Sequence, residues 1–306
     1  MAFQTVIVTG GAGFIGSHLV DALVHRAARV VVIDKAKPAA NRKNALAKYK
    51  QMDILDTGLE ALIEKEKPDV IFHLAAHIHD RESVKEPVHN AQENILGSLA
   101  VFEAARRHAN RVIFASTGVT YGEQSQLPIA ETAVARPLTP YAVSKLTGER
   151  YLHFYATVYG VSYAALRFSN VYGPRQDSSA ESGAVGIFAR ALLAGKIPSI
   201  NNDGKTTRDY IYVDDVVDAM LRAAESDAIG VFNIGTGIET TTQAVFEAVR
   251  KEVGVNTQPE AREEVQDVPK HVALDAAAAQ EIFSWKPKTS FVDGVKKTVE
   301  WFRETL

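Results

Sequence analysis

A tyrosine and a lysine stand four residues apart at the start of a predicted helix, in the segment TPYAVSK that begins at Thr139. Thr139 can cap the helix, and Pro140 suits its first turn, where a missing N–H has no cost. Residues i and i+4 share a helical face, so Tyr141 and Lys145 point the same way. An ammonium within about 4–6 Å favours a phenolate and lowers the phenol pKa by about 1–3 units. The pair therefore predicts a general base for a hydroxyl proton. An ordinary amphipathic pair is the alternative.

A hydroxyl residue ends the predicted strand before this helix. The segment RVIFAST closes on Thr117, 24 residues before Tyr141. The carboxyl ends of parallel strands form the edge where ligands bind in open α/β folds. We expect the Thr117 hydroxyl to bridge a substrate oxygen and the phenol.

A glycine-rich turn near the N-terminus predicts a phosphate cradle. Gly11, Gly13 and Gly16 form a GxGxxG pattern, with Gly10 in front, between a strand that ends at Thr9 and a helix. Glycines allow the backbone to approach a pyrophosphate, whose charge then lies on the N–H groups of the helix N-terminus. The pattern alone is weak, but its strand-turn-helix setting favours a bound dinucleotide over a simple turn.

Acidic residues after the second and third strands predict which dinucleotide binds. Asp34, 18 residues after Gly16, would accept hydrogen bonds from the adenosine ribose. A carboxylate there repels a 2′-phosphate and favours NAD, although Lys35 and Lys37 keep NADP open. Asp53 is expected at the adenine edge with Ile54 beside it, and a surface loop acid is the alternative for Asp53.

Composition limits the class of protein. The chain has 306 residues, is 46% hydrophobic and carries a net charge of −3 with both signs interspersed. This balance argues against nucleic acid or an anionic membrane surface as the main partner. No apolar run reaches about 18 residues, and no signal segment is evident. The absence of cysteine excludes thiolate chemistry and fits a reducing cytoplasm.

Strand-sized apolar runs alternate with helical segments near residues 16–26 and 93–108. This rhythm predicts an α/β fold with a Rossmann-type, doubly wound parallel sheet. We expect an NAD-binding domain over residues 1–167, with a segment near 211–237 returning to it. Residues 168–306 would mainly form a smaller substrate-binding lobe. Helices are expected after Asp275 and from Ser290, where Asp293 completes a capping box.

Six motifs then occur in order: TGGAGFIGSH, HLAA, ASTGVTYG, YAVSK, RFSNVYGP and TTRDYIYVDDVVDA. Together they resemble the extended short-chain dehydrogenase/reductase family, close to its UDP-glucose (galactose) 4-epimerases. The resemblance covers nearly the whole chain and implies bound NAD and 4-epimerisation of a UDP-hexose through transient oxidation at C4. It implies Tyr141 as base and acid, Lys145 as the group that orients the nicotinamide ribose and lowers the tyrosine pKa, and Thr117 as their partner.

The resemblance also implies further contacts to the cofactor and the substrate. The cofactor residues are Gly10, Gly13, Phe14, Ile15, Gly16, Asp34, Lys35, Asp53, Ile54, Leu74, Ala75, Ala76, Asn94, Tyr141 and Lys145. Asn170 matches a position that binds the diphosphate or the sugar, and Arg208 matches one that reaches the pyrophosphate. A surface salt bridge with Asp209 or Asp214 is the alternative for Arg208. Two positions depart from the family: Asn201 replaces an aromatic residue, and Arg262 stands in a shifted run. Nucleotide identity is therefore less secure than the chemistry, and Val272 leaves N-acetylated sugars open.

Other functions remain as alternatives. Gly118 and Val119 replace the acidic residues typical of dehydratases and decarboxylases. A reductase would exchange its cofactor, and a non-catalytic sensor usually lacks the Tyr or Lys. A hexuronate or N-acetylhexosamine 4-epimerase stays open. His73, His77 and His79, followed by Asp80, resemble metal-ligand spacing, but a structural His73 and loop roles for the others are favoured and no metal is expected. The family resemblance also implies a homodimer through the helices near 93–108 and 141–159.

Overall fold

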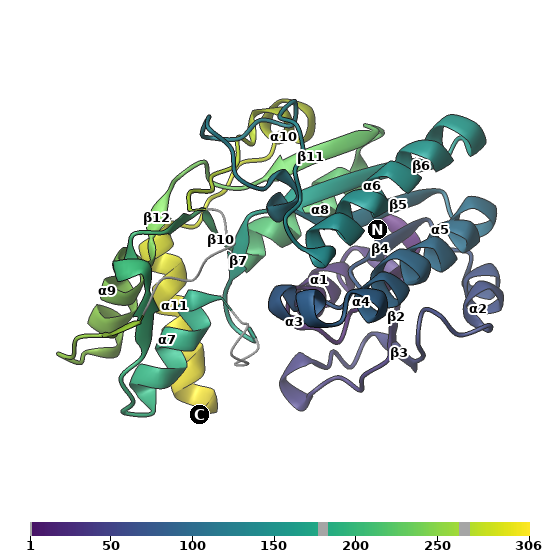
Figure 1. Cartoon of the computed structure of the whole chain (residues 1–306). Helices are drawn as coiled ribbons and strands as arrows, with labels where there is room; N and C mark the ends of the chain where they lie inside the picture. The colour runs from purple at the N-terminus through teal and green to yellow at the C-terminus, as the bar shows by residue number, and fades with distance from the viewer. Residues whose placement is uncertain (1, 177–182, 263–269) are drawn as a thin grey trace.

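The computed structural model describes residues 2–176, 183–262 and 270–306, which fold into two lobes (Figure 1). A seven-stranded parallel sheet forms the centre of the first lobe, in the order β3-β2-β1-β4-β5-β6-β11. The strand order reverses between β1 and β4, which marks the crevice where open sheets bind ligands. The predicted Rossmann-type sheet is confirmed. Its strands are β1 (Phe3–Thr9), β2 (Ala27–Asp34), β3 (Lys48–Gln51), β4 (Val70–His73), β5 (Arg111–Thr117), β6 (Ser162–Phe168) and β11 (Gly230–Ile234).

Both faces of this sheet are covered by helices, which explains the continuous apolar runs of its strands. Successive strand residues point to opposite faces. Val6 and Val8 of β1 lie in one buried apolar cluster, and Ile7 lies in the other. Helices α1 (Phe14–Leu23) and α8 (Val213–Glu225) cover the Val6 face. The Ile7 face is covered by α2 (Leu59–Glu66), α5 (Gly97–His108) and α6 (Pro140–Tyr159).

Local capping explains where the functional helices begin. Thr139 accepts a hydrogen bond from the Ala142 N–H at 3.3 Å and Pro140 occupies the first turn of α6, as predicted. Helix α1 begins at Phe14, two residues before the predicted start, because Gly13 already acts as its N-cap. The expected helix over 93–108 begins as a π-helical turn, η2 (Gln92–Leu96), before α5. The other short helices are η1 (Ala40–Arg42), α3 (Asp80–Lys85), α4 (Pro87–Ala91) and η3 (Gly118–Tyr121).

The second lobe packs three helices around an aromatic and aliphatic core that includes Phe188, Phe246 and Val299. The helices are α7 (Ala184–Leu193), α9 (Thr242–Val253) and α11 (Phe291–Thr305). Ser290 caps α11 by accepting from the Asp293 N–H at 3.1 Å, and its hydroxyl donates to the Asp293 carboxylate at 2.6 Å. The predicted N-cap is confirmed, with the second bond made between the two side chains. The short strands are β7 (Asn170–Tyr172), β8 (Ser199–Asn201), β9 (Thr207–Arg208), β10 (Tyr210–Tyr212), β12 (Thr240–Thr241) and β13 (Glu260–Arg262), and η4 spans Asn202–Gly204.

The division by residue number is less simple than expected. Strand β11 and helix α8 belong to the sheet lobe, close to the predicted returning segment. Helix α10 (Ala277–Phe283) also packs there, where Phe283 meets Phe232 of β11 with ring centroids 4.6 Å apart. Part of the loop expected after Asn170, residues 177–182, lies outside the described residues. Within the described ranges, no helix combines the length and the apolarity needed to cross a bilayer.

Candidate active site

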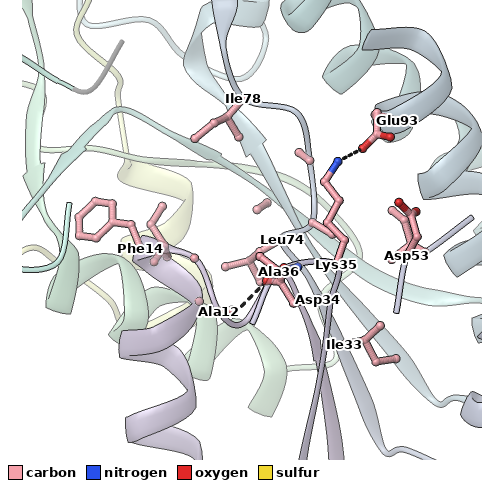
Figure 2. Close-up of a pocket in the computed structure, with 18 of the residues that line it drawn as sticks. Ala12, Phe14, Ile33, Asp34, Lys35, Ala36, Asp53, Leu74, Ile78 and Glu93 are labelled. Carbon is pink, nitrogen blue, oxygen red and sulfur yellow. Dashed lines mark hydrogen bonds and ion pairs between the residues drawn. The ribbon is translucent and has the colours of Figure 1, made fainter. Parts of the chain in front are cut away.

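A cleft of about 350 Å³ lies at the carboxyl edge of the sheet, beside the β1/β4 switch point (Figure 2). This volume lies within the range of small-molecule sites. Fourteen of the fifteen predicted cofactor residues line it. They are Gly10, Gly13, Phe14, Ile15, Gly16, Asp34, Lys35, Asp53, Ile54, Leu74, Ala75, Ala76, Tyr141 and Lys145. One cavity therefore joins the glycine turn to the tyrosine and lysine.

The glycine turn has no room for side chains. Gly10 has φ +72°, and a Cβ there would lie 2.6 Å from the backbone nitrogen of Ala75. A Cβ on Gly16 would lie 2.3 Å from the carbonyl oxygen of Gly10. The turn thus brings bare backbone and the N-terminus of α1 to the cavity wall. A helix N-terminus carries a partial positive charge and unpaired N–H groups, which fits a pyrophosphate.

Asp34 is fixed at the end of β2 by the backbone around it. Its carboxylate accepts hydrogen bonds from the N–H groups of Ala12 at 3.0 Å and Ala36 at 2.9 Å. Next to it, the Lys35 ammonium lies 2.5 Å from a carboxylate oxygen of Glu93 (Figure 2). Lys35 is thus engaged by an acid and is not poised to attract a 2′-phosphate. With the glycine cradle, these residues fit NAD.

Tyr141 and Lys145 both face this cleft from α6, in agreement with their predicted common face. The Lys145 ammonium donates to the carbonyl of Ala115 at 2.9 Å and lies 4.8 Å from the ring centroid of Phe114. The Tyr141 N–H donates to the hydroxyl of Ser83 at 3.2 Å. The Lys145 side chain is therefore held against β5, and the backbone of Tyr141 is held against α3.

Burial dominates the electrostatics of this pair. It raises the pKa of Tyr141 well above that of a free phenol, and the negative charge of Asp80 raises it further. Burial also lowers the pKa of Lys145 to about 7, while Glu149 acts in the opposite direction. The expected lowering of the Tyr141 pKa by Lys145 is wrong for this arrangement. The physical reason is that loss of solvation dominates the shift and the negative charge of Asp80 adds to it.

The two hydroxyl residues that end β5 have different surroundings. Thr117 is half-buried and accepts a hydrogen bond from the Val119 N–H at 3.3 Å, which caps η3. Ser116, rather than Thr117, lines the cleft. The Ser116 hydroxyl donates to Glu149 at 2.5 Å, so it is committed to a structural contact. The role of Thr117 stays a prediction.

Asn94 does not line the cleft, which departs from its predicted contact with the cofactor. Its buried amide accepts from the His77 N–H at 2.7 Å and donates to the His77 carbonyl and to the Ser144 hydroxyl, each at 3.0 Å. Every polar atom of the side chain is thus used to hold the loop after β4 against α6. Asn94 shapes the cleft wall from behind.

Three of the predicted substrate residues lie on the second lobe, whereas Thr117 ends β5 of the first. Asn170 begins β7, and its N–H donates to the Asp209 carbonyl at 2.8 Å. Burial lowers the pKa of Arg208 in β9, and its charged surroundings include Glu123 and Asp80 of the first lobe. Asp80 also acts on Tyr141, so it links Arg208 to the catalytic candidates. Arg262 is exposed at the end of β13, where it is the register partner of Asn201.

His73 is a fully buried structural residue. Its ring nitrogens lie 2.7 Å from the Thr9 hydroxyl and 3.0 Å from the Ser98 hydroxyl, and the ring stacks on Phe114. The ring of His77 packs against those of His79 and His89 in the loop region. No set of three or more His, Asp or Glu residues in the described ranges is arranged to hold a metal ion. Val272 is buried against Tyr121, Ile129 and Leu274.

Sequence reasoning missed several residues of the cleft. Arg42, Met52, Ile78, Glu93 and Phe168 line it. It also missed a buried network beneath Ser116, in which Arg167 donates two hydrogen bonds to Glu149, at 2.9 and 2.5 Å. Helical spacing was the available signal for Glu149, because it lies one turn beyond Lys145. The partners of Glu93 and Arg167 come from distant segments, which spacing cannot reveal.

Comparison with known proteins agrees with this geometry. The sequence pattern of the NAD dependent epimerase/dehydratase family matches residues 6–235. A UDP-glucose 4-epimerase from Mycolicibacterium smegmatis is 40% identical over 97% of this chain and 98% of its own. The crystal structure of a UDP-glucose 4-epimerase with UDP-glucose from Thermotoga maritima has a TM-score of 0.94 at 40% identity, over 99% of both chains. The UDP-glucose 4-epimerase complex with NAD from Thermus thermophilus has a TM-score of 0.92 at 36% identity, over 99% of this chain and 100% of that chain. The chain therefore belongs to the NAD dependent epimerase/dehydratase family.

Proposed function

We propose that this protein catalyses the NAD-dependent 4-epimerisation of a UDP-hexose of the UDP-glucose/UDP-galactose type. The observation that carries the proposal is the single cleft in which a glycine cradle and Asp34 meet Tyr141 and Lys145. The names of the similar proteins from M. smegmatis, T. maritima and T. thermophilus support the choice of reaction. Gly118 and Val119 stand at the positions where dehydratases carry the acidic residues that their reaction requires.

Different residues of the cleft would bind different parts of the cofactor. Gly10, Gly13 and the first turn of α1 would bind the pyrophosphate, and Asp34 would bind the adenosine ribose. Asp53 and Ile54 would hold the adenine. When bound, NAD would take a hydride from C4 of the sugar and return it to the opposite face.

Tyr141 would remove the proton of the sugar 4-hydroxyl and later return it. Burial keeps the phenol protonated, but only its phenolate form can accept the proton of the sugar hydroxyl. Positive charge beside the ring is therefore needed to favour the phenolate. Lys145, one helical turn away, supplies that charge in its protonated form, and a pKa of about 7 keeps a substantial share of it protonated near neutral pH. The Thr117 hydroxyl would donate to the substrate oxygen, because its own oxygen already accepts from Val119.

The second lobe would bind the nucleotide diphosphate. Arg208 presents a guanidinium, which suits bidentate recognition of phosphate. Asn170 offers an amide close by, since its N–H donates to the carbonyl of Asp209, the residue after Arg208. Arg262 stays a predicted contact from its exposed place on β13. Asn201, the other position that departs from the family, lies on β8, the strand that pairs with β13. Asn201 and Arg262 would therefore both lie at the nucleotide end of the substrate.

Absorbance of the purified protein tests the reaction directly. We expect retained dinucleotide, and we expect a rise at the wavelength of reduced nicotinamide when UDP-galactose is added without free cofactor. Product analysis by NMR should then show the 4-epimer. A protein that turns over only with a continuous supply of NADPH would be a reductase, and a protein that binds dinucleotide without converting any sugar would be a sensor.

The sugar is tested by a substrate panel. UDP-glucose, UDP-N-acetylglucosamine and UDP-glucuronate, each at equal concentration, separate the hexose reaction from the two related 4-epimerisations. We expect the highest kcat/KM for UDP-glucose and its 4-epimer. A preference for an N-acetylated or uronic sugar would replace the proposed substrate without changing the roles of Tyr141 and Lys145.

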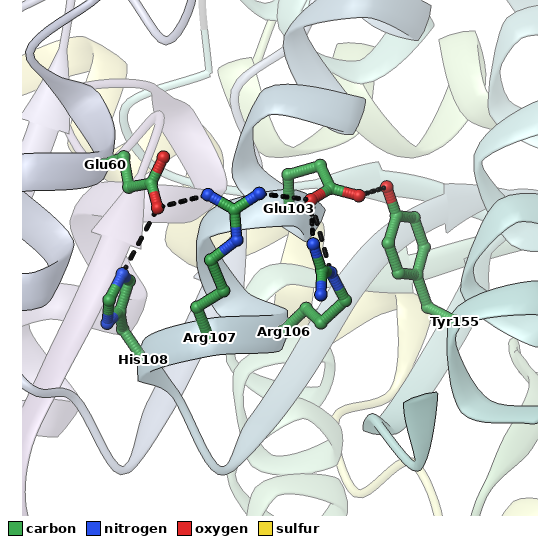
Figure 3. Close-up of polar contacts among 6 residues, drawn as sticks. All are labelled: Glu60, Glu103, Arg106, Arg107, His108 and Tyr155. Carbon is green, nitrogen blue, oxygen red and sulfur yellow. Dashed lines mark hydrogen bonds and ion pairs between the residues drawn. The ribbon is translucent and has the colours of Figure 1, made fainter. Parts of the chain in front are cut away.

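We also propose a homodimer through α5 and α6. An apolar row along the exposed face of α6 includes Val143, Tyr151, Phe154 and Val158. Behind it, Glu103 of α5 accepts from the Tyr155 hydroxyl at 2.7 Å and from Arg106, while Arg107 bridges Glu103 and Glu60 (Figure 3). These contacts tie α2, α5 and α6 into one stiff surface. A cytoplasmic location is likewise proposed, and cell fractionation would test it.

A further inference from the structure

The cleft carries an ion pair that the proposed reaction does not use. Lys35 follows Asp34 at the end of β2, and Glu93 lies in the π-helical turn η2. Both side chains line the dinucleotide cleft, and their charged groups lie 2.5 Å apart. Figure 2 shows Lys35 reaching from the β2 side of the cleft to Glu93 on the opposite wall, next to Asp53.

Both ends of this pair are anchored. The carbonyl of Lys35 accepts from the Gln51 side chain at 3.2 Å, and the neighbouring Ala36 N–H donates to Asp34. On the other wall, Gly97 follows η2 and packs closely against Ile54. A Cβ at Gly97 would lie 2.6 Å from the Ile54 side chain. The two backbone segments that carry the charges are therefore fixed, and the pair connects them across the cleft.

Pairing changes the charge that Lys35 and Glu93 present to a dinucleotide. A dinucleotide is anionic, so an isolated Glu93 carboxylate in its cleft would repel it. An isolated Lys35 ammonium beside Asp34 would favour a 2′-phosphate. When they are paired, the charges of the two groups cancel. The ion pair then forms a neutral link across the cleft, beside Asp34 and Asp53, the residues proposed to bind adenosine. Glu93 is the less exposed partner, with 18% side-chain exposure against 58% for Lys35.

We propose that Lys35 and Glu93 form a clasp across the adenosine end of the cleft that slows release of the dinucleotide. The inference rests on the proposed function, because a 4-epimerase must keep its reduced cofactor until the hydride has returned to the sugar. Opening of the clasp requires separation of an ion pair, whereas binding of the ribose and pyrophosphate is left to Asp34 and the glycine turn. The clasp therefore acts on the rate of release.

The test measures release of NADH from loaded protein. Each variant is mixed with a large excess of NAD, and the loss of bound-nicotinamide fluorescence gives the rate. Lys35→Met and Glu93→Gln should each accelerate release about three- to fivefold, the range of a partly exposed ion pair. The charge exchange Lys35→Glu with Glu93→Lys should return release to within about twofold of the original rate. Lys37→Met, an exposed lysine outside the cleft lining, is the matched control and should match the original protein.

The outcomes separate the clasp from its alternatives. If only Lys35→Met accelerates release, Lys35 acts alone on the cofactor and the clasp is overturned. If neither variant accelerates release, or the charge exchange fails to restore it, the clasp is also overturned. Thermal unfolding without dinucleotide checks that the variants keep the original stability, and an equal loss there would make the pair merely structural. Sugar-dependent reduction of the original protein tests the proposed function separately, so that one idea can fail while the other stands.

Discussion

At the scale of single residues, Tyr141 stands in an environment that opposes its proposed task. Burial and Asp80 raise the pKa of its phenol, so the neutral form is favoured at the pH where a base is needed. Lys145 can offset this only while it carries charge, and burial has brought its pKa to about 7. The proton transfer is therefore controlled by the local balance of charge around two buried groups.

Removal of the Tyr141 hydroxyl tests this role. We expect Tyr141→Phe to lower kcat by about 10²- to 10⁴-fold, the range for loss of general acid–base catalysis. The ring and its packing remain, so KM for the UDP-sugar and the amount of retained dinucleotide should stay close to the original values. Steady-state kinetics and the absorbance of the purified variant provide both readouts. Full activity in this variant would exclude Tyr141 as the base.

Which single residues could be predicted from the sequence depends on where their partners lie. Gly10, Asp34 and Tyr141 act through local backbone geometry, so motif spacing placed them correctly in one cleft. Asn94 was assigned to the cofactor, and its contact there stays a prediction. Its bonds to His77 and Ser144 were not predicted, because these partners come from a loop and a helix elsewhere in the chain. Glu93 escaped notice for the same reason, since its partner Lys35 lies 58 residues away.

At the scale of elements, the tight turn between β1 and α1 positions the cofactor site. Gly16→Ala would place a methyl carbon 2.3 Å from the Gly10 carbonyl oxygen, so the turn must open. We expect a loss of retained dinucleotide and a destabilisation of about 1–3 kcal/mol, as for overpacking in a close-packed region. Gly58→Ala is the matched control, because its nearest neighbour would lie 3.6 Å away. Equal cofactor content in both variants would contradict a packing role for Gly16.

The same scale explains His73, which joins β1, β4 and α5 beneath the cleft. Burial, assisted by the charge of Lys145, lowers the pKa of His73 to about 3. The unfolded chain then binds more protons than the folded one between about pH 3 and 6.5. The stability that depends on a neutral His73 is therefore complete above pH 6.5 and is lost as the pH falls toward 3.

His73→Phe should separate stability from this acid response. At pH 7.5 the variant should lose about 1–3 kcal/mol, because the Thr9 and Ser98 hydroxyls lose a buried partner. Below pH 6.5 the original protein should lose up to about 1.4 kcal/mol more per pH unit than the variant. Urea unfolding at several pH values measures the difference. Parallel curves for the two proteins would show that His73 does not set the acid response.

At the scale of the whole molecule, the sequence predicted the parallel sheet because strands buried on both faces are continuous apolar runs, and the helices between them show a helical period. Helix α8 and strand β11 lie within the segment near 211–237 that was expected to return to the first lobe, whereas α10 packs there although residues 168–306 were assigned mainly to the second. Arg208 of the second lobe likewise interacts electrostatically with Asp80 of the first lobe. Such contacts depend on how distant segments pack, which local periodicity does not encode.

The surface of α6 carries the last prediction, because a contiguous exposed apolar patch marks a candidate protein–protein contact. Phe154 is 44% exposed in the middle of the row, between Tyr151 and Val158. Phe154→Glu would place a charge at the centre of the proposed dimer face, and we expect a shift from dimer to monomer in analytical ultracentrifugation. Dinucleotide content should persist, because the cleft opens elsewhere on the lobe. Val292→Glu, 68% exposed on α11 of the other lobe, is the matched control and should remain dimeric. A monomeric original protein, or a Phe154→Glu variant of unchanged mass, would contradict this face as the interface.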